Sequence, residues 1–469
     1  MNPLDIAELR LYVANYLGFE DVKTCALVCR SWYWYFQPLV WHTFSTPSHM
    51  DADDTTRQIA LKDSIQNNAH WIRHFHVTGG IGVLHSLPDT WLERCKSLLT
   101  IRFDVYHRDD LQRWNRLIRS NSGLRKLGLP SGLDRIVNDP HVLAILKSHS
   151  QLRELRLSSP FSISYLTRIL QASPRLLKLF GVHLTDELDK PSDEHVQTEG
   201  STTATTRTTT EMASTTCVLQ HLDLARLDGR PALNHLIACT RHLETLSFQD
   251  SIGACRSSLI RLFQEGRLRH LVNLSLDKED DYINLINAIP DGQLRMLKVR
   301  TSSILCLSAI LQRHGPTLET LLLPGMHGCP ELAQVMYRCP RLKVFGSGQG
   351  VHDDTHADVR AFLYGPWVCR SLEVLSVPIG LFRGNFTSTP PILDDALAMI
   401  QIRPKRQFEP AVAELLFMER LRQLEKLWFV DFVVQEEEIA LSYTSQVEVL
   451  TNYNGRGLQR DRLDPFSSF

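Results

Sequence analysis

Two short segments of the sequence carry residue types that could do chemistry. Gly346-Ser-Gly348-Gln-Gly350 has the glycine content of a phosphate-binding loop, but it lacks the third glycine spacing of a dinucleotide loop and favours a surface turn. His352-Asp-Asp-Thr-His356 offers side chains that can bind metal, yet no preceding strand or distal ligand accompanies them. We therefore expect no cofactor and no metal ion at either segment.

The cysteines are the remaining candidates for nucleophiles or metal ligands. The 469 residues contain ten cysteines, scattered without a CxxC pair, which fits reduced intracellular thiols better than disulfides or structural zinc. Cys25 and Cys29 belong to a helical pattern described below, and Cys329 and Cys339 fall between repeats. A nucleophilic cysteine beside a histidine stays open, but no residue stands out as catalytic. We expect a protein that is not an enzyme.

The overall charge argues against two classes of partner. Lys and Arg number 51 against 52 Asp and Glu, a formal charge of -1, so no global field draws the chain to nucleic acid or to a membrane. Charged residues interrupt every long apolar stretch, and the N-terminus lacks the order of a signal peptide. We expect a cytoplasmic or nuclear protein. The Arg403 to Arg406 cluster could be an import signal, although a solvated loop is the favoured interpretation.

An internal repeat organises most of the chain. Its pattern is apolar, two variable residues, apolar, variable, apolar, as in Leu124-Arg-Lys-Leu127-Gly-Leu129. Strong copies begin at Leu98, Leu124, Leu152, Leu219, Leu243, Leu271, Leu294, Leu318 and Leu372, and weaker copies begin at Ile72, Leu176, Leu342, Leu424 and Val447. Regular steps between copies range from 23 to 28 residues. This period is typical of one strand and one helix per repeat.

The residues around each copy predict how a repeat folds. The alternating end of the motif predicts a short strand, and the spacing of Leu143 and Leu146 predicts a helix between strands. Pro174, Pro316 and Pro340 each stand two residues before a first leucine, where proline ends the preceding helix. His74 and His76 alternate with apolar residues and should face away from the core. We expect an α/β solenoid with a parallel sheet on its concave side and helices on its convex side.

Over residues 70–452 the repeats resemble the leucine-rich repeat family. The Asn or Cys that this family usually has after the strand is mostly missing here, which predicts an irregular arc. Two segments interrupt the repeats. Residues 192–216 are Ser/Thr-rich and predicted to be a disordered insert, either phosphorylated as a switch or merely tolerated. Residues 379–420 are read as an irregular insert with an extra helix, and 453–469 as a tail.

The first 45 residues differ from the repeats. Ile6, Leu9, Val13, Tyr16 and Leu17 recur at helical spacing and Gly18 can end that helix. A second helical face contains Val22, Cys25, Ala26 and Cys29, and an aromatic segment from Ser31 to Phe36 is closed by Pro38 and by Leu39-Val-Trp41. We expect three short helices, joined to the repeats by a linker or connecting helix over residues 46–69. So few residues need a partner or a neighbouring domain to cover their apolar faces.

Three blocks in this region resemble an F-box. They are Tyr16-Leu-Gly-Phe-Glu-Asp-Val22, Cys25-Ala-Leu-Val-Cys-Arg-Ser-Trp32 and Leu39-Val-Trp41, while Ala7 stands where the family usually has proline. The resemblance implies an adaptor that docks on the Skp subunit of a Skp-cullin-F-box ubiquitin ligase and holds a protein substrate with its repeats. The residues that it implies for the Skp contact are Ile6, Leu9, Val13, Leu17, Val22, Val28 and Trp32. The alternative is a leucine-rich repeat scaffold for protein interactions without a ligase link, with the N-terminal helices as a cap.

Overall fold

The computed structural model describes most of the chain. The described residues are 7–14, 16–45, 63–77, 89–103, 111–129, 140–158, 160–184, 217–227, 230–250, 252–253, 255–278, 282–326, 329–347, 357–363, 365–377 and 379–380, and in the C-terminal part 416–417, 420–421, 423–424, 426, 429–434, 437–444 and 447–450. The chain divides into two compact units, Met1–Arg241 and His242–Phe469. The predicted insert at 192–216, the Arg403 to Arg406 cluster and the 453–469 tail lie outside the described residues, as does the predicted insert at 379–420 except for residues 379–380, 416–417 and 420.

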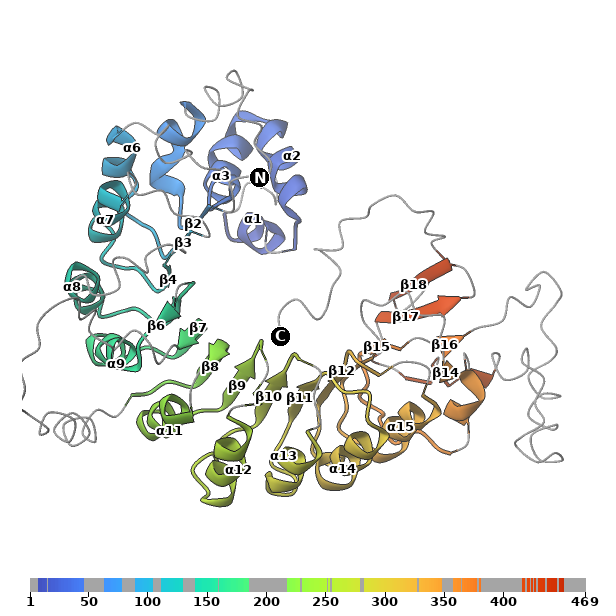
Figure 1. Ribbon diagram of the computed structural model, residues 1–469. Helices are drawn as coiled ribbons and strands as arrows, with labels where there is room; N and C mark the ends of the chain where they lie inside the picture. Colours follow the sequence, from blue (N-terminus) through green and yellow to red (C-terminus); the bar gives the residue numbers. More distant parts are fainter. Residues whose placement is uncertain are drawn as a thin grey trace, which may run out of the picture. The chain divides into compact units, whose positions relative to one another are not determined.

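Three short helices open the first unit, as the sequence predicts: α1 (Ala7–Ala14), α2 (Phe19–Val28) and α3 (Arg30–Val40) (Figure 1). Gly18, predicted to end the first helix, instead caps the second, because its N–H donates to the Asp21 carboxylate at 3.2 Å. The third helix includes Pro38 and ends at Val40, within the segment Pro38 to Trp41 predicted to close it. The helix continues past the proline because Trp41 N–H still donates to the Gln37 carbonyl oxygen at 3.1 Å.

A parallel sheet follows in the same unit. Its strands pair in the order β1 (Thr43–Ser45), β2 (His74–Val77), β3 (Thr100–Phe103), β4 (Lys126–Gly128), β5 (Glu154–Arg156), β7 (Lys178–Leu184) and β8 (His221–Leu227), with β6 (Pro160–Phe161) beside β7. The connecting helices are η2 (Ala69–Trp71), α6 (Asp89–Arg94), α7 (Leu111–Arg119), α8 (Pro140–Ser148), α9 (Ile163–Ala172) and α11 (Arg230–Cys239). Figure 1 shows α6 to α9 together on one side of these strands.

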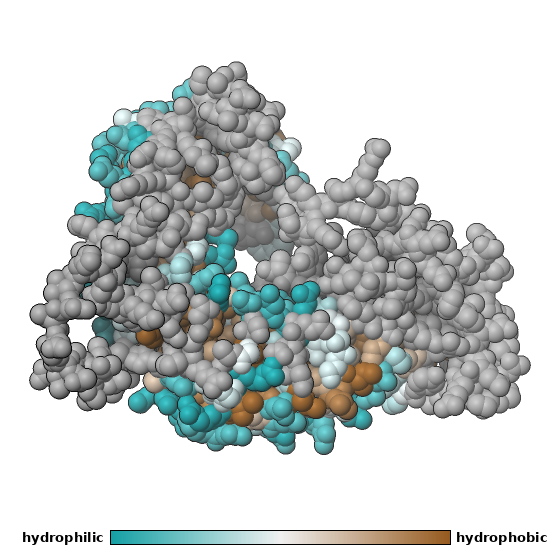
Figure 2. Space-filling model, viewed as in Figure 1, coloured by the Kyte–Doolittle hydropathy of each residue, from teal (hydrophilic) through white to brown (hydrophobic). Residues whose placement is uncertain are grey.

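The second unit repeats this arrangement. Its parallel strands are β9 (Thr245–Phe248), β10 (Asn273–Leu276), β11 (Met296–Val299), β12 (Thr320–Leu323), β13 (Val344–Ser347), β15 (Val374–Ser376) and β17 (Phe429–Val434), and β14 (Ala357–Asp358) pairs with β16 (Ile379–Gly380). Its helices are α12 (Arg256–Gln264), α13 (Ile283–Ala288), α14 (Ile304–His314), η7 (Pro330–Ala333), α15 (Gln334–Arg338) and η8 (Val359–Leu363). In Figure 2, hydrophilic residues cover much of the outer edge of these helices, and hydrophobic patches lie between the hydrophilic residues.

The parallel sheet ends one copy earlier than the sequence predicts. The weak copy at Val447 forms β19 (Val447–Leu450), which pairs antiparallel with β18 (Glu437–Thr444), and β18 pairs antiparallel with β17. The prediction of a further parallel repeat at Val447 is therefore wrong. The 13 residues from Phe429 to Leu441 turn back as a hairpin and leave no room for the helix that a parallel crossover needs.

The motif leucines form the core of the sheet, and their burial explains why each motif folds as a strand. Leu124, Leu127, Leu152 and Leu155 are all at most 2% exposed, and the equivalent leucines of the other strong copies are buried with them. Registered pairing stacks each leucine on its counterpart in the next repeat, as Leu127 pairs with Leu155. His74 and His76 alternate with buried Phe75 and Val77, which confirms that both histidines face away from the core.

A buried polar side chain links neighbouring repeats. Asn121, three residues before the first leucine of its copy, accepts the Leu98 N–H at 2.7 Å and donates to the Cys95 carbonyl oxygen at 2.8 Å. His149 holds the same position one repeat later, and its Nε2 lies 3.1 Å from the Ile118 carbonyl oxygen. Each link satisfies backbone groups of the preceding repeat that water cannot reach. The link was not predicted from sequence.

The prolines end their helices where the sequence places them. Helices α9, α14 and α15 stop at Ala172, His314 and Arg338, each two residues before a proline. Proline lacks the N–H that would continue the helix. Among the described residues, no helix combines the length and the apolar character that crossing a membrane demands.

The N-terminal helices are joined to the repeat sheet by direct contacts. Strand β1 follows α3 and pairs with β2, so that Phe44 stacks on Phe75 with ring centroids 5.3 Å apart. The Gln37 amide nitrogen also donates to the Asn68 side-chain oxygen at 3.0 Å. Helix α3 is therefore tied to the first repeat through the pairing of β1, the Phe44 to Phe75 stack and the Gln37 to Asn68 hydrogen bond.

Candidate functional site

The N-terminal helices have a small core of their own. Val22, Ala26 and Phe36 are buried together, and partly buried side chains surround them, namely Ala14, Leu17, Cys25, Trp32, Tyr35, Leu39 and Val40. The Phe36 ring lies 5.4 Å from Trp32 and 5.1 Å from Tyr35, measured between centroids. These ring pairs order the aromatic side chains within α3, and the contact of Phe36 with Val22 and Ala26 packs α3 against α2.

Many large apolar side chains of this module remain exposed. Of the ten large hydrophobic residues that are exposed among the described residues, seven fall between residues 9 and 34. We call these seven the N-terminal apolar surface: Leu9, Tyr12, Tyr16, Leu27, Val28, Tyr33 and Trp34. Scattered exposed apolar residues are normal on a protein, but a concentration in so short a segment is typical of an interaction site.

Helix α1 contributes one stripe to this surface. Leu9, Tyr12 and Tyr16 are spaced by three and four residues, which places them on one side of the helix and the turn that follows it. The Tyr16 hydroxyl donates to the Tyr12 hydroxyl at 3.3 Å, and the two ring centroids are 5.1 Å apart. This hydrogen bond raises the pKa of Tyr16, with a smaller effect from burial. The paired rings form a neutral aromatic surface.

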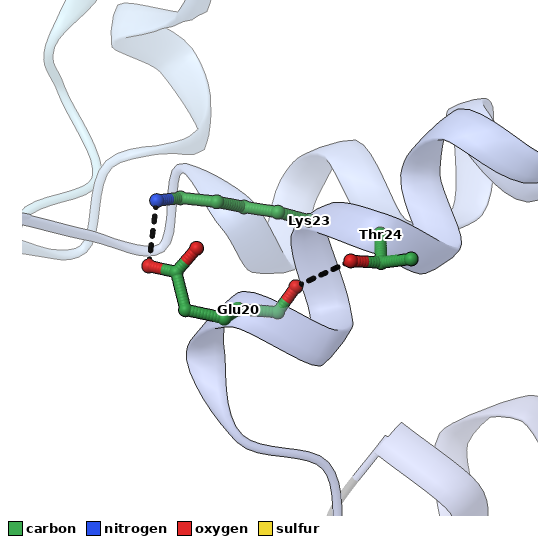
Figure 3. A network of polar contacts seen from close by, with 3 residues as sticks. All are labelled: Glu20, Lys23 and Thr24. Atoms are coloured by element: carbon green, nitrogen blue, oxygen red, sulfur yellow. Dashed lines mark hydrogen bonds and ion pairs between the residues drawn. The ribbon is translucent and has the colours of Figure 1, made fainter.

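Helix α2 changes character along its exposed side. At its start, Lys23 Nζ lies 2.9 Å from Glu20 Oε1, and the Thr24 hydroxyl donates to the Glu20 carbonyl oxygen at 3.0 Å (Figure 3). One turn later the same side presents Leu27, which is 84% exposed, followed by Val28. Polar side chains therefore face water on the first half of the helix, whereas two aliphatic side chains face water on its last turn. That turn is a natural contact point for a partner.

The junction between α2 and α3 completes the surface. Cys29 separates the two helices in an extended conformation, with its Sγ 3.2 Å from Ser31 Oγ. Tyr33 and Trp34 follow in α3, packed edge to face at 5.5 Å, and Trp34 is 63% exposed. Burial, and to a lesser extent Asp21, raises the pKa of the Cys25 thiol, which disfavours the reactive thiolate.

The seven residues implied by the F-box resemblance differ in how far they are buried. Leu9 and Val28 are exposed and belong to the N-terminal apolar surface, and Val13 is half-buried. Val22 is a core residue, and Leu17 and Trp32 pack against it. Ile6 lies outside the described residues.

Five residues of the surface were not predicted as contacts. They are Tyr12, Tyr16, Leu27, Tyr33 and Trp34. Spacing from Leu9 could have identified the two tyrosines of α1, because both follow at helical intervals. No sequence signal marks Leu27, since it continues a side of α2 that is otherwise polar.

The other candidates from the sequence do not assemble into a site among the described residues. Gly346 lies within strand β13, and His352 to His356 fall outside the described residues. Cys329 precedes η7 and Cys339 follows α15, and burial raises the pKa of both thiols, to about 11 and about 12. No group of three His, Cys, Asp or Glu side chains in this part of the structure could hold a metal ion.

The described groups of the N-terminal helices are suited to binding. Seven of their exposed side chains are large aliphatic or aromatic groups, and among the exposed charged residues Glu20 is paired with Lys23. The free energy falls when a partner removes such a surface from water. No protein-family model matches this chain, and no curated protein matches it in sequence.

Proposed function

We propose that this protein is a substrate-recruiting adaptor of a Skp-cullin-F-box ubiquitin ligase. In this proposal the N-terminal helices dock on the Skp subunit, the repeat units hold a protein substrate, and other subunits perform the transfer of ubiquitin. The observation that carries the proposal is the N-terminal apolar surface, found on the same helices whose sequence resembles an F-box.

The surface supports a hydrophobic docking mode. Leu27, Val28 and Trp34 are large apolar groups that three short helices leave in water. Burying one such side chain stabilises a complex by roughly 1.5 to 3 kcal/mol, so three or four of them suffice for a specific contact. The module is also tied to the repeats through β1 and the Gln37 to Asn68 hydrogen bond, so a docked partner would be held at a fixed distance from the first repeats.

The test is co-purification of a Skp subunit with the full chain and with two double variants. Leu27→Asp with Val28→Asp places two unpaired charges in the proposed interface, and should weaken binding at least a hundredfold. The matched control is Ile304→Asp with Leu305→Asp, which changes the same kind of exposed aliphatic pair on α14. The control should bind the Skp subunit like the unchanged protein.

Folding is checked separately, since a misfolded module would also fail to bind. Leu27 and Val28 are exposed, so their replacement should leave the melting temperature within a few degrees. Val22→Asp buries a charge in the module core and should instead unfold it. The proposal is rejected if the folded protein does not retain a Skp subunit, or if ubiquitin transfer needs no other ligase subunit. A scaffold without a ligase link would then be the better interpretation.

A further inference from the structure

Two rows of side chains cross the sheet of the first unit on the face opposite its core. In each strand they alternate with buried residues such as Phe75, Leu127 and Leu155. Backbone register aligns the first row as Thr43, His74, Thr100, Lys126, Glu154, Lys178 and His221, and the second as Ser45, His76, Arg102, Gly128, Arg156 and Phe180. We call these two rows the basic face.

The described charges on this face are mostly positive. Arg102, Lys126, Arg156 and Lys178 supply four permanent cations, and three histidines add charge when protonated. Of the described acids near them, Glu154 offsets one of the four cations and Asp223 is buried. Glu154 forms an ion pair with Lys126 at 3.0 Å, and Asp223, which is 6% exposed, accepts the Gly181 N–H at 3.3 Å.

The arginine side chains are held along the sheet. A Cβ on Gly128 would lie 3.2 Å from Arg102 Cγ, which shows that the Arg102 stem crosses the space that glycine leaves. The guanidinium carbon of Arg156 lies 5.7 Å from the centroid of the Phe180 ring, a cation-π arrangement. The Arg156 guanidinium group therefore gives up less conformational freedom when it binds a ligand.

The same rows in the second unit carry little charge. From β9 to β17 the first row contains Thr245, Asn273, Met296, Thr320, Val344, Val374 and Phe429, and the second contains Ser247, Ser275, Lys298, Leu322, Gly346, Ser376 and Asp431. The cation among them, Lys298, is neutralised by Asp277 at 2.8 Å. Since the whole chain has a formal charge of -1, the cations of the first unit are a local concentration and not a general excess.

We propose that the basic face binds an acidic polypeptide segment that lies across the strands. Lys126 and Lys178 stand two strands apart, as do Arg102 and Arg156, a separation of about 10 Å. An extended peptide that rises about 3.1 Å per residue presents acidic side chains at every third position at nearly the same interval. The charge complementarity thus selects a peptide with Asp or Glu at every third residue.

A nucleic acid fits this face less well. Glu154 sits in the middle of the first row, where it would repel a continuous phosphate backbone, whereas a peptide can place a neutral residue there. The inference does not rest on the proposed ligase function, because a scaffold could use the same face. Its test contains no Skp subunit, so the two proposals can fail separately.

The experiment measures binding of a labelled peptide of about 16 residues, with Glu at every third position among Gly and Ser, to the full chain by fluorescence anisotropy. Lys126→Gln combined with Lys178→Gln removes two exposed cations and should weaken binding about tenfold. The matched control is Lys343→Gln, because Lys343 is equally exposed and forms the same kind of ion pair, with Glu319 at 2.7 Å, in the second unit. This control should bind within twofold of the unchanged protein.

Several results would overturn the proposal. Equal affinity for a peptide with Gln in place of Glu would show that charge does not matter, and equal or tighter binding of a thymidine oligonucleotide of the same charge would show a general anion site. An undiminished affinity of the lysine double variant would place the contact elsewhere. The acidic run from Asp186 to Glu199 is a competing occupant within this chain. Tenfold tighter binding after deletion of residues 185–216 would assign the face to that run instead of an external partner.

Discussion

Replacing Asn121 by alanine should destabilise the first unit by about 3 to 4 kcal/mol. The side chain is 1% exposed and bridges two repeats through three hydrogen bonds, to Leu98 N–H at 2.7 Å and to the carbonyl oxygens of Cys95 and Leu117 at 2.8 and 2.7 Å. The Leu117 oxygen keeps the Ser120 hydroxyl as a donor. The Leu98 N–H and the Cys95 carbonyl group belong to fully buried residues and would lose this partner, at about 1 to 3 kcal/mol each.

Two measurements check this value. Urea unfolding followed by circular dichroism gives the change in free energy, and hydrogen exchange of the Leu98 amide reports the bond itself. Exchange should accelerate at least a hundredfold in Asn121→Ala. Asn273→Ala is the control, because Asn273 is half-buried and donates to the Thr245 hydroxyl at 3.0 Å, so its loss should cost about 1 kcal/mol or less. If Asn121→Ala cost no more than the control, the side chain would not link the repeats in solution.

Three further predictions follow from other features. Burial, and then the nearby Arg313 charge, lowers the folded-state pKa of His314 to about 4 from 6.5, so the unfolded chain takes up the proton first. Stability should therefore fall from about pH 6.5 toward pH 4, by ~2 kcal/mol at pH 5, and urea titrations at pH 5 and 7.5 should show a smaller difference for His314→Leu. Gly181→Ala should lower stability by more than about 1 kcal/mol, because Gly181 has a φ of 67° and an added Cβ would collide with the Leu157 carbonyl oxygen; an unchanged melting curve would contradict this. Deletion of residues 192–216 should leave the melting temperature within about 10 °C, since these residues offer few apolar groups to a core, and a larger drop would mean that they pack.

The repeat strands could be predicted from the sequence, whereas the contacts between repeats could not. Leucine spacing reports which side of a strand is buried, and Leu127 and Leu155 need no further information to find their place. The role of Asn121 depends on backbone groups more than 20 residues away, which a local pattern does not contain. The hairpin at Val447 has the same cause, because an alternating pattern indicates a strand without its direction.

The N-terminal site shows a similar limit. Helical spacing identified the apolar faces of the three helices, yet it could not separate Val22, which is a core residue, from Val28, which is exposed. Whether a face is covered depends on how the helices cross and on which aromatic rings of α3 fill the space between them. The sequence therefore predicted the module and its three helices, and the structure was needed to say which side chains a partner could reach.

Strand β1 also affects how readily a truncated form of the protein aggregates. A parallel sheet with an uncovered outer strand offers unpaired backbone groups to any other chain, which is a common start of aggregation. Here the outermost strand of the first unit has three residues, with exposed Thr43 and Ser45 on either side of buried Phe44. A strand so short and polar is a poor template for self-association. Truncation after Ser45 would leave β2 as the outer strand and remove Phe44, one of the ring partners of Phe75. A fragment that begins near Arg30 would keep β1 but lose the Val22 and Ala26 side chains that cover Phe36, so the full N-terminal module should give the most soluble form of the repeats.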